Sequence, residues 1–147
     1  MSIRRYHPAD FNRLAEIYDV SHPDELYAEQ GDFTFIPWAE NEYMMTIFAG
    51  AEIYVYREDK TILGFCAFTD DHINWFFVHP EHRGKGIGDQ MLTYLLANKL
   101  KKGTTLFVWK SNAPAKSLYK KHGFLAYQEF YKHLQGRLLL VNKMVYA

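Results

Sequence analysis

The residues that point most directly to chemistry lie between Val78 and Gly88, in the sequence Val-His-Pro-Glu-His-Arg-Gly-Lys-Gly-Ile-Gly. The apolar run 73–78 that leads into it, in which only Asn74 is polar, predicts a buried strand. This strand is expected to stop at Pro80, because proline lacks the N–H needed for a sheet ladder. Apolar residues at helical spacing follow the glycines, namely Ile87, Met91, Leu92, Leu95, Leu96 and Leu100. The segment is therefore predicted to be a strand, a glycine-rich turn and a helix.

A helix that begins after such a turn offers unpaired backbone N–H groups at the positive end of its dipole, which together attract anions. Gly84, Gly86 and Gly88 have no Cβ, so a phosphate group can approach the backbone closely. The spacing fits neither the phosphate loop of nucleotide hydrolases nor the Gly-x-Gly-x-x-Gly fingerprint of dinucleotide-binding proteins. The sequence therefore predicts a site for a pyrophosphate, and the alternative is a tight turn that simply needs glycines.

The run Arg83-Gly-Lys-Gly-Ile-Gly88, after Val-His-Pro, resembles the acyl-CoA loop of the GNAT superfamily of N-acetyltransferases. A second segment, Asn112-Ala-Pro-Ala-Lys-Ser-Leu-Tyr-Lys-Lys-His-Gly-Phe124, resembles the downstream Asn-x-x-Ala-x-x-Leu-Tyr-x-x-x-Gly-Phe pattern of the same superfamily. In physical terms, Ser111 or Asn112 is suited to cap a helix and Gly123 to end it in the left-handed conformation. The resemblance covers nearly the whole chain, but its specific motifs occupy only 78–88 and 112–124.

The resemblance implies an α/β (α+β) fold of the GNAT type, with a mixed, mostly antiparallel sheet of six to seven strands flanked by helices. It also implies that the fourth and fifth strands splay apart and that the pantetheine arm of the cofactor enters the gap. We expect a single N-acetyltransferase domain over residues 1–147. Sequence patterns predict strands at 3–6, 52–57, 61–69, 72–78, 104–109, 125–132 and 137–146. They predict helices from Pro8, in two pieces within 24–50, after the glycines, and at 112–122.

The resemblance further implies acetyl-CoA as co-substrate and gives roles to particular residues. Arg83 and the amides of 83–88 would bind the pyrophosphate, Asn112 the pantetheine arm, and a main-chain N–H near 77–78 the acyl oxygen. Tyr119 would be the general acid for the leaving thiolate, since a pKa of about 10 keeps a phenol protonated at neutral pH. Taken alone, Tyr119 is better explained as a core aromatic residue beside Leu118. The implied cofactor-binding residues are Phe77, Val78, Arg83, Gly84, Lys85, Gly86, Ile87, Gly88 and Asn112.

No general base stands out in the sequence. The predicted strand 72–78 contains no Asp or Glu, and its His72, near a turn, is expected to be exposed to solvent. Glu129 and His133, on a later predicted strand, are further candidates. His79 and His82 lie in the loop without an evident third ligand, so no metal is expected.

The segment after the first predicted helix is the expected substrate-binding region, and it is unusually aromatic. Its rings could hold a cationic amine or simply pack on the sheet, and packing is favoured for most of them. Its carboxylates could attract a cationic substrate, although solvated loop charges are the simpler interpretation. The rings are Tyr18, Tyr27, Phe33, Phe35, Trp38 and Tyr43, and the carboxylates are Asp24, Glu25, Glu29 and Asp32.

Composition agrees with a small cytoplasmic enzyme. The chain has 147 residues with 17 basic and 17 acidic side chains, so it has no electrostatic signature for nucleic acid or an anionic membrane. Its one cysteine, Cys66, cannot form an internal disulfide and is expected to be a buried apolar filler. No segment has the pattern of a signal peptide or a membrane span.

The sequence therefore predicts an acyltransferase that moves an acetyl group from acetyl-CoA to a primary amine, on a small molecule or a peptide, by direct attack. The alternative is a non-catalytic acyl-CoA-binding sensor that acts through a partner. Acetylation of RNA is disfavoured by the neutral charge. The identity of the amine and the oligomeric state, including a homodimer, stay open.

Overall fold

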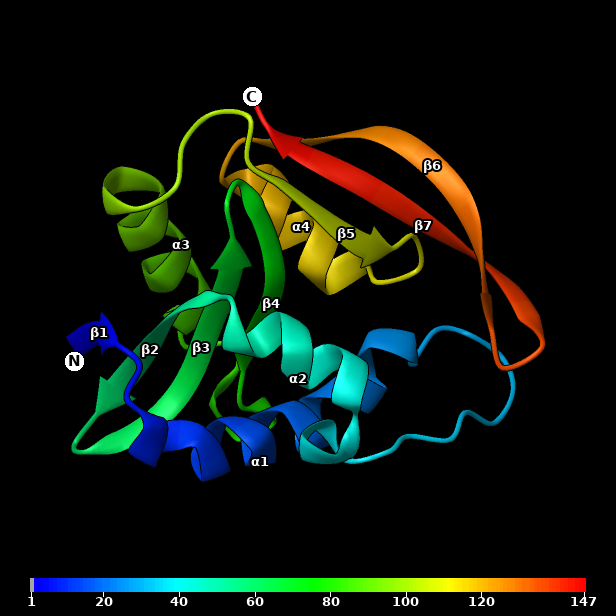
Figure 1. The fold of residues 1–147 in the computed structure, drawn as a ribbon. Helices are drawn as coiled ribbons and strands as arrows, with labels where there is room; N and C mark the ends of the chain where they lie inside the picture. Colours follow the sequence, from blue (N-terminus) through cyan, green and yellow to red (C-terminus); the bar gives the residue numbers. More distant parts are fainter. Residues whose placement is uncertain (1) are drawn as a thin grey trace.

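The structure, a computed structural model, describes residues 2–147, and its centre is one mixed sheet of seven strands. The strand order is β1-β2-β3-β4-β5-β7-β6, and every neighbouring pair is antiparallel except the parallel pair β4 and β5 (Figure 1). The predicted mixed, mostly antiparallel sheet is thereby confirmed. The strands are β1 Ser2–Arg5, β2 Glu52–Glu58, β3 Thr61–Thr69, β4 His72–Val78, β5 Thr105–Trp109, β6 Phe124–Leu134 and β7 Arg137–Tyr146.

Helices cover both faces of the sheet. The α-helices are α1 Phe11–Ser21, α2 Glu42–Ala49, α3 Ile87–Asn98 and α4 Ala113–Lys121, and the 3₁₀ helices are η1 Pro8–Asp10, η2 His22–Leu26, η3 Trp38–Glu40 and η4 Pro80–His82. Side chains of α1 and η3 form one hydrophobic cluster with Phe65 of β3, and side chains of α3 and α4 form a second with Cys66. Consecutive strand residues point to opposite faces, which explains the nearly continuous apolar sequence of β3. None of the helices within residues 2–147 has both the length and the apolar character that crossing a membrane requires.

The strands β4 and β5 pair only at one end. His72 pairs with Thr105 and Ile73 with Leu106, and beyond these two positions the strands separate. This confirms the predicted splay. The N–H of His79 donates to Leu63 at 2.8 Å, and Phe77 lies opposite Phe65 on β3. Because bonding alternates along an antiparallel strand, the backbone groups of Phe77 face β3, and those of the even-numbered residues 76 and 78 face the gap.

The prediction for residues 24–50 is wrong in its first half. Instead of a helix, the short η2 continues directly from α1, and no helix or strand occurs between Tyr27 and Pro37. Gly31 has a φ of 109°, in the left-handed region, which interrupts any helix there. The second piece is confirmed as α2, whose N-cap Asn41 accepts a hydrogen bond from the Met44 N–H at 3.0 Å.

Hydrogen bonds anchor the irregular segment 27–37 to the turn between β6 and β7 (Figure 1). We call these contacts, which join Asp32 and Thr34 to Gln135 and Arg137, the hairpin clasp. The Thr34 N–H donates to Gln135 Oε1 at 2.8 Å, and Gln135 Nε2 donates back to the Thr34 carbonyl at 2.7 Å. Arg137 Nη1 donates to the Asp32 carbonyl at 3.0 Å, and its guanidinium lies 4.7 Å from the centre of the Phe33 ring. A segment without regular structure is thereby held against the sheet.

Candidate active site

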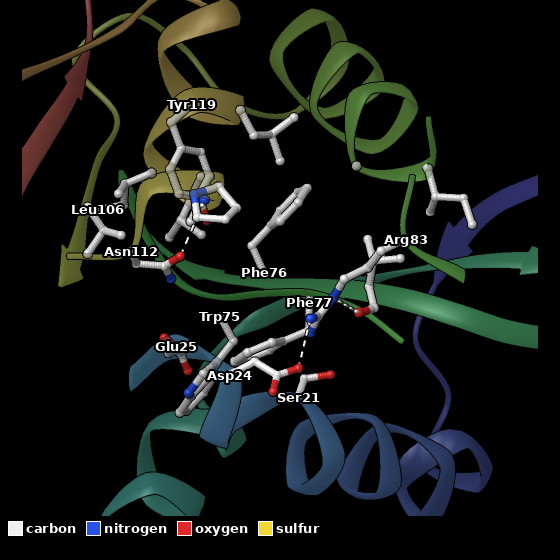
Figure 2. Close-up of a pocket in the computed structure, with 18 of the residues that line it drawn as sticks. Ser21, Asp24, Glu25, Trp75, Phe76, Phe77, Arg83, Leu106, Asn112 and Tyr119 are labelled. Atoms are coloured by element: carbon white, nitrogen blue, oxygen red, sulfur yellow. Dashed lines mark hydrogen bonds and ion pairs between the residues drawn. The ribbon is translucent and has the colours of Figure 1, made fainter. Parts of the chain in front are cut away.

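A pocket of about 650 Å³ passes through the gap between β4 and β5. Figure 2 shows α3 and α4 on one side of β4, and α1 with η2 on the other. We call the part lined by Gly84, Gly86 and Gly88 the loop end, and the part lined by Asp24 and Glu25 the acidic end. Strand residues of both faces line the middle, including Phe76 and Trp75. The pocket therefore joins the two faces of the sheet.

Two of the loop glycines are required by backbone conformation. Gly84 has a φ of 77°, and Gly86, the N-cap of α3, has a φ of 82°, where an L-amino acid is strained. A Cβ on Gly84 would meet nothing within 4 Å, and one on Gly86 would meet only the Gln90 amide at 4.0 Å. The first turn of α3 therefore opens onto free space, as an anion site requires.

The other residues of the loop have different surroundings. A Cβ on Gly88 would lie 3.1 Å from Leu118 Cδ2, so this glycine lets α3 approach α4, a packing role that the sequence did not indicate. Ile87 is 3% exposed and belongs to the core under α3. Lys85 is exposed, does not line the pocket, and lies 3.4 Å from His82 Nδ1 through its Nζ.

Arg83 lies between the loop and the acidic end. Its Nε donates to the Val78 carbonyl at 3.2 Å, and its Nη1 donates to Asp24 Oδ2 at 2.8 Å (Figure 2). The first bond occupies a backbone acceptor at the end of β4, and the second reaches η2. The guanidinium is therefore held at the pocket by groups from two elements.

Asn112 and Tyr119 both line the pocket from α4. Asn112 is the N-cap, and its Oδ1 accepts the Ala115 N–H at 3.4 Å, while its Nδ2 carries two further donors. Tyr119 is 8% exposed, and its ring centre lies 6.0 Å from that of Phe76. Burial raises the pKa of Tyr119, and the nearby Cys66 and Glu25 add to the effect, so the hydroxyl stays protonated. Tyr119 is thus a core residue and a pocket residue at once.

The sequence candidates for a general base do not line the pocket. His72 is half-buried, not exposed as expected, and its Nδ1 lies 2.8 Å from Thr105 Oγ1; burial, with Lys143, lowers its pKa. Glu129 pairs with Lys110 at 3.0 Å and lies on β6, where His133 is exposed.

Two of the four carboxylates after α1 face the pocket, in contrast to the expectation of solvated loop charges, whereas Glu29 and Asp32 do not line it. Asp24 and Glu25 line it together with Ser21 and Trp75. Their proximity arises because η2 turns the end of α1 toward the gap between strands, a tertiary arrangement that periodicity does not reveal. Among the aromatic residues of this region, Tyr27 lines the pocket, whereas Tyr18 and Trp38 lie in the core, so the packing interpretation holds for these two.

The two loop histidines have a third neighbour. Ligand atoms of His79, Glu81 and His82 lie within 4.8 Å of one another, so the expectation that no third ligand is near was wrong. His79 Nδ1 already accepts the Glu81 N–H at 3.2 Å, and the Lys85 ammonium lies beside His82. Both contacts oppose binding of a cation there.

Comparison with known proteins agrees with this arrangement. A family model described as an acetyltransferase (GNAT) domain matches residues 49–125, just over half of the chain. The chain is 37% identical over 72 residues to the peptidyl-lysine N-acetyltransferase YjaB of Salmonella typhimurium, which covers 49% of this chain and 48% of that protein. The chain thus spans about half the length of this relative.

A second relative and a solved structure extend over more of the chain. A putative [ribosomal protein bS18]-alanine N-acetyltransferase of Bacillus subtilis is 28% identical over 120 residues, covering 76% of this chain and 78% of that protein. The structure of yncA, a putative acetyltransferase from Salmonella typhimurium with its cofactor acetyl-CoA, superposes with a TM-score of 0.73 at 23% identity, covering 99% of this chain and 92% of that one. The fold, the pocket and the family match lead to one assignment: this chain belongs to the GNAT family of acetyltransferases.

Proposed function

We propose that this protein transfers an acetyl group from acetyl-CoA to a primary amine by direct attack. The observation that carries the proposal is the pocket through the sheet, with a glycine-lined helix N-terminus at one end, Tyr119 between, and carboxylates at the other. The names of the relatives support an amine acceptor but differ in the amine, a lysine in one and an alanine in the other. A small-molecule amine and a peptide amine are both within the proposal. The reducing cytosol, where an unpaired cysteine is ordinary, is the proposed location.

The loop end fits a pyrophosphate. The φ values of Gly84 and Gly86 and the open space beside them leave the amides of the first turn of α3 accessible, as described above. Acetyl-CoA would supply the acetyl thioester. Arg83 would add a charge-assisted hydrogen bond, and Asn112 Nδ2 would donate to an amide of the pantetheine arm. Lys85 would contribute its backbone N–H, because its side chain does not line the pocket.

The strand β4 would stabilise negative charge on the acyl oxygen. Preorganised backbone N–H groups in a pocket are effective donors to such an oxyanion. The pairing with β3 directs the backbone of Phe77 away from the gap, so the Val78 N–H, at the even position, is the better candidate. Phe77 would contribute its ring to the pocket wall.

Tyr119 would donate to the departing sulfur. Its raised pKa keeps the phenol protonated at every physiological pH. A thiol has a pKa of about 8.5, below that of a phenol, so complete proton transfer to the thiolate is unfavourable at the start. We therefore assign Tyr119 first a hydrogen bond to the developing thiolate and then the proton that sulfur finally takes.

The test is release of free thiol from acetyl-CoA when the protein is mixed with polyamines, amino acids, aminoglycosides and peptides with free N-termini. Turnover with one class and not with buffer alone would support the proposal. Calorimetric titration with CoA on the same preparation separates the alternatives. CoA binding without turnover on any amine would favour the non-catalytic sensor, and absence of CoA binding would refute both.

A further inference from the structure

The acidic end of the pocket contains a carboxylate–imidazole pair. Glu25 Oε1 and His22 Nδ1 are 2.7 Å apart, and their side chains are 31% and 26% exposed. The His22 ring stacks on Tyr18 with centres 4.8 Å apart and meets the edge of Phe35 at 5.3 Å. The imidazole is therefore held in place beside the Glu25 carboxylate.

Glu25 faces the site of the proposed chemistry. It lines the same pocket as Tyr119, and its charge acts on the Tyr119 hydroxyl across the gap. Figure 2 shows Glu25 and Trp75 on one side of β4 and Tyr119 on the opposite side. Direct attack by an amine uses a donor to the leaving sulfur and an acceptor for the amine proton, and Tyr119 and Glu25 offer these two groups to one pocket.

A second observation at this end points to a bound ligand. Ser21 is 1% exposed, lines the pocket, and its hydroxyl has no hydrogen-bond partner among residues 2–147. A buried hydroxyl without a partner is uncommon in native proteins and calls for an explanation. A polar group bound beside it would provide the missing partner.

The other charges near Glu25 are already paired. Asp24 is neutralised by Arg83, which is the one arginine or lysine among the pocket-lining residues of the described chain. Asp19 accepts the Trp38 N–H at 2.9 Å, and the Tyr18 hydroxyl contacts the Met44 sulfur at 3.4 Å. His22 is thus the direct partner of Glu25, and the two carboxylates that line this end of the pocket outnumber its one arginine.

We propose that Glu25 is the catalytic residue that accepts a proton from the acceptor amine, that His22 positions it and takes the proton onward, and that the acceptor is a cationic primary amine without an adjacent carboxylate. The inference rests on the proposed acetyl transfer. The N–C bond forms as the C–S bond breaks, and the C–S electron pair leaves with sulfur. Of the two protons that the ammonium loses, one is released to solvent through Glu25 and His22. The other is taken up by the Tyr119 phenolate, which has given its own proton to sulfur, so that the phenol is restored.

The main test is Glu25→Gln in the full chain, assayed with the best amine from the screen. We expect kcat at pH 7 to fall about 10²-fold or more, as for loss of a general base, with CoA affinity unchanged. The deficit should shrink as pH rises toward the amine pKa of about 10, because the amine then deprotonates in solution. The matched control is Glu16→Gln on the outer side of α1, where the carboxylate is 59% exposed, and its kcat should equal that of the wild type.

Two further variants separate chemistry from structure. Glu25→Ala should be rescued in part by added formate, which supplies a carboxylate, and not by chloride at equal ionic strength. His22→Gln should shift the acid side of the pH–rate profile with little change in KM, which a purely structural role would not do. Melting temperatures and CoA titrations verify that each variant is folded.

The substrate class is tested with matched pairs. Tyramine should be acetylated faster than tyrosine, and phenethylamine faster than phenylalanine, and Glu25→Gln should reduce both ratios. An active wild type with a Glu25→Gln rate within twofold of it, or a preference for the amino acids, would overturn the inference and leave the acetyltransferase proposal standing. A wild type that acetylates no amine would overturn both.

Discussion

Arg83 and Asp24 meet across the pocket, with Nη1 donating to Oδ2 at 2.8 Å, and so connect the glycine loop to the 3₁₀ helix after α1. The two side chains are 43% and 52% exposed, and an ion pair this open to water contributes at most about 1 kcal/mol. A pyrophosphate at the loop end would attract the same guanidinium. Arg83 can thus exchange Asp24, at the acidic end, for a phosphate at the loop end, and this one contact links the two ends of the pocket.

Asp24→Asn should therefore strengthen CoA binding. The change frees Arg83 and removes a negative charge near the phosphates, and the energy of an exposed pair corresponds to a gain of about two- to fivefold. Calorimetric titration at low and high salt would measure it, with the gain largest at low salt. Glu16→Gln serves as the control, and equal or weaker affinity in Asp24→Asn would contradict the exchange.

Gly86→Val should abolish CoA binding while the fold is kept. A β-branched residue at a φ of 82° is strained by about 1–2 kcal/mol and would displace the first turn of α3. Gly103→Val is the matched control, since Gly103 has a φ of 96°, open space around it, and no part in the pocket. Both variants should melt a few degrees lower, and only Gly86→Val should lose CoA affinity. Equal CoA affinity in the two variants would mean that the glycine loop is only a turn and does not bind the cofactor.

Tyr119→Phe should lower kcat about 10²-fold and leave acetyl-CoA affinity unchanged, because it removes one donor and conserves the ring. Tyr56→Phe is the comparison: Tyr56 is 2% exposed, lies in the same core cluster and does not line the pocket. Both changes should have similar small effects on the melting temperature. If kcat in Tyr119→Phe matches that of Tyr56→Phe, the hydroxyl has no part in the reaction.

Asp10→Asn should make stability less dependent on acid pH. Hydrogen bonds from Arg4 at 2.8 and 3.0 Å, and one from the His7 N–H at 2.9 Å, lower the pKa of Asp10 below its ordinary value near 3.9. A depressed pKa stabilises the fold above the unfolded value, and this contribution disappears as pH falls through the folded value. At pH 7 the free energy of unfolding of the variant should be about 1.5–3 kcal/mol lower than that of the wild type. This difference should disappear as the pH falls below 4. Urea unfolding between pH 2 and 7 measures it, with the exposed Asp71→Asn expected to change little.

Local sequence patterns were sufficient to predict the parts of the site that are formed by continuous segments of the chain. The positive φ of Gly86 at the start of α3, and the Asn112 and Gly123 ends of α4, follow from which residues tolerate those conformations. The hairpins of β2, β3 and β4 follow from apolar runs separated by short polar turns. Such signals need no knowledge of the distant chain.

The sequence identified Asp24 and Glu25 as candidates but could not place them at the pocket, for a physical reason. Glu25 and Ser21 line one pocket with Trp75 and Tyr119 only because four segments converge where two parallel strands separate. A carboxylate near the end of a helix looks the same in sequence whether it faces water or a pocket. The packing contact of Gly88 could not be predicted for a related reason, since its neighbour Leu118 comes from another helix.

The hairpin clasp has a consequence for how the substrate region can vary. It joins Thr34 to Gln135, 101 positions apart, and at Thr34 and Asp32 it uses backbone atoms. The side chains at Thr34 and Asp32 can therefore be substituted while these backbone contacts persist. Gly31 is the exception, because a Cβ there would overlap the Arg137 guanidinium. Sequence variation in this segment is thus decoupled from its attachment to the sheet, with Gly31 as the fixed position.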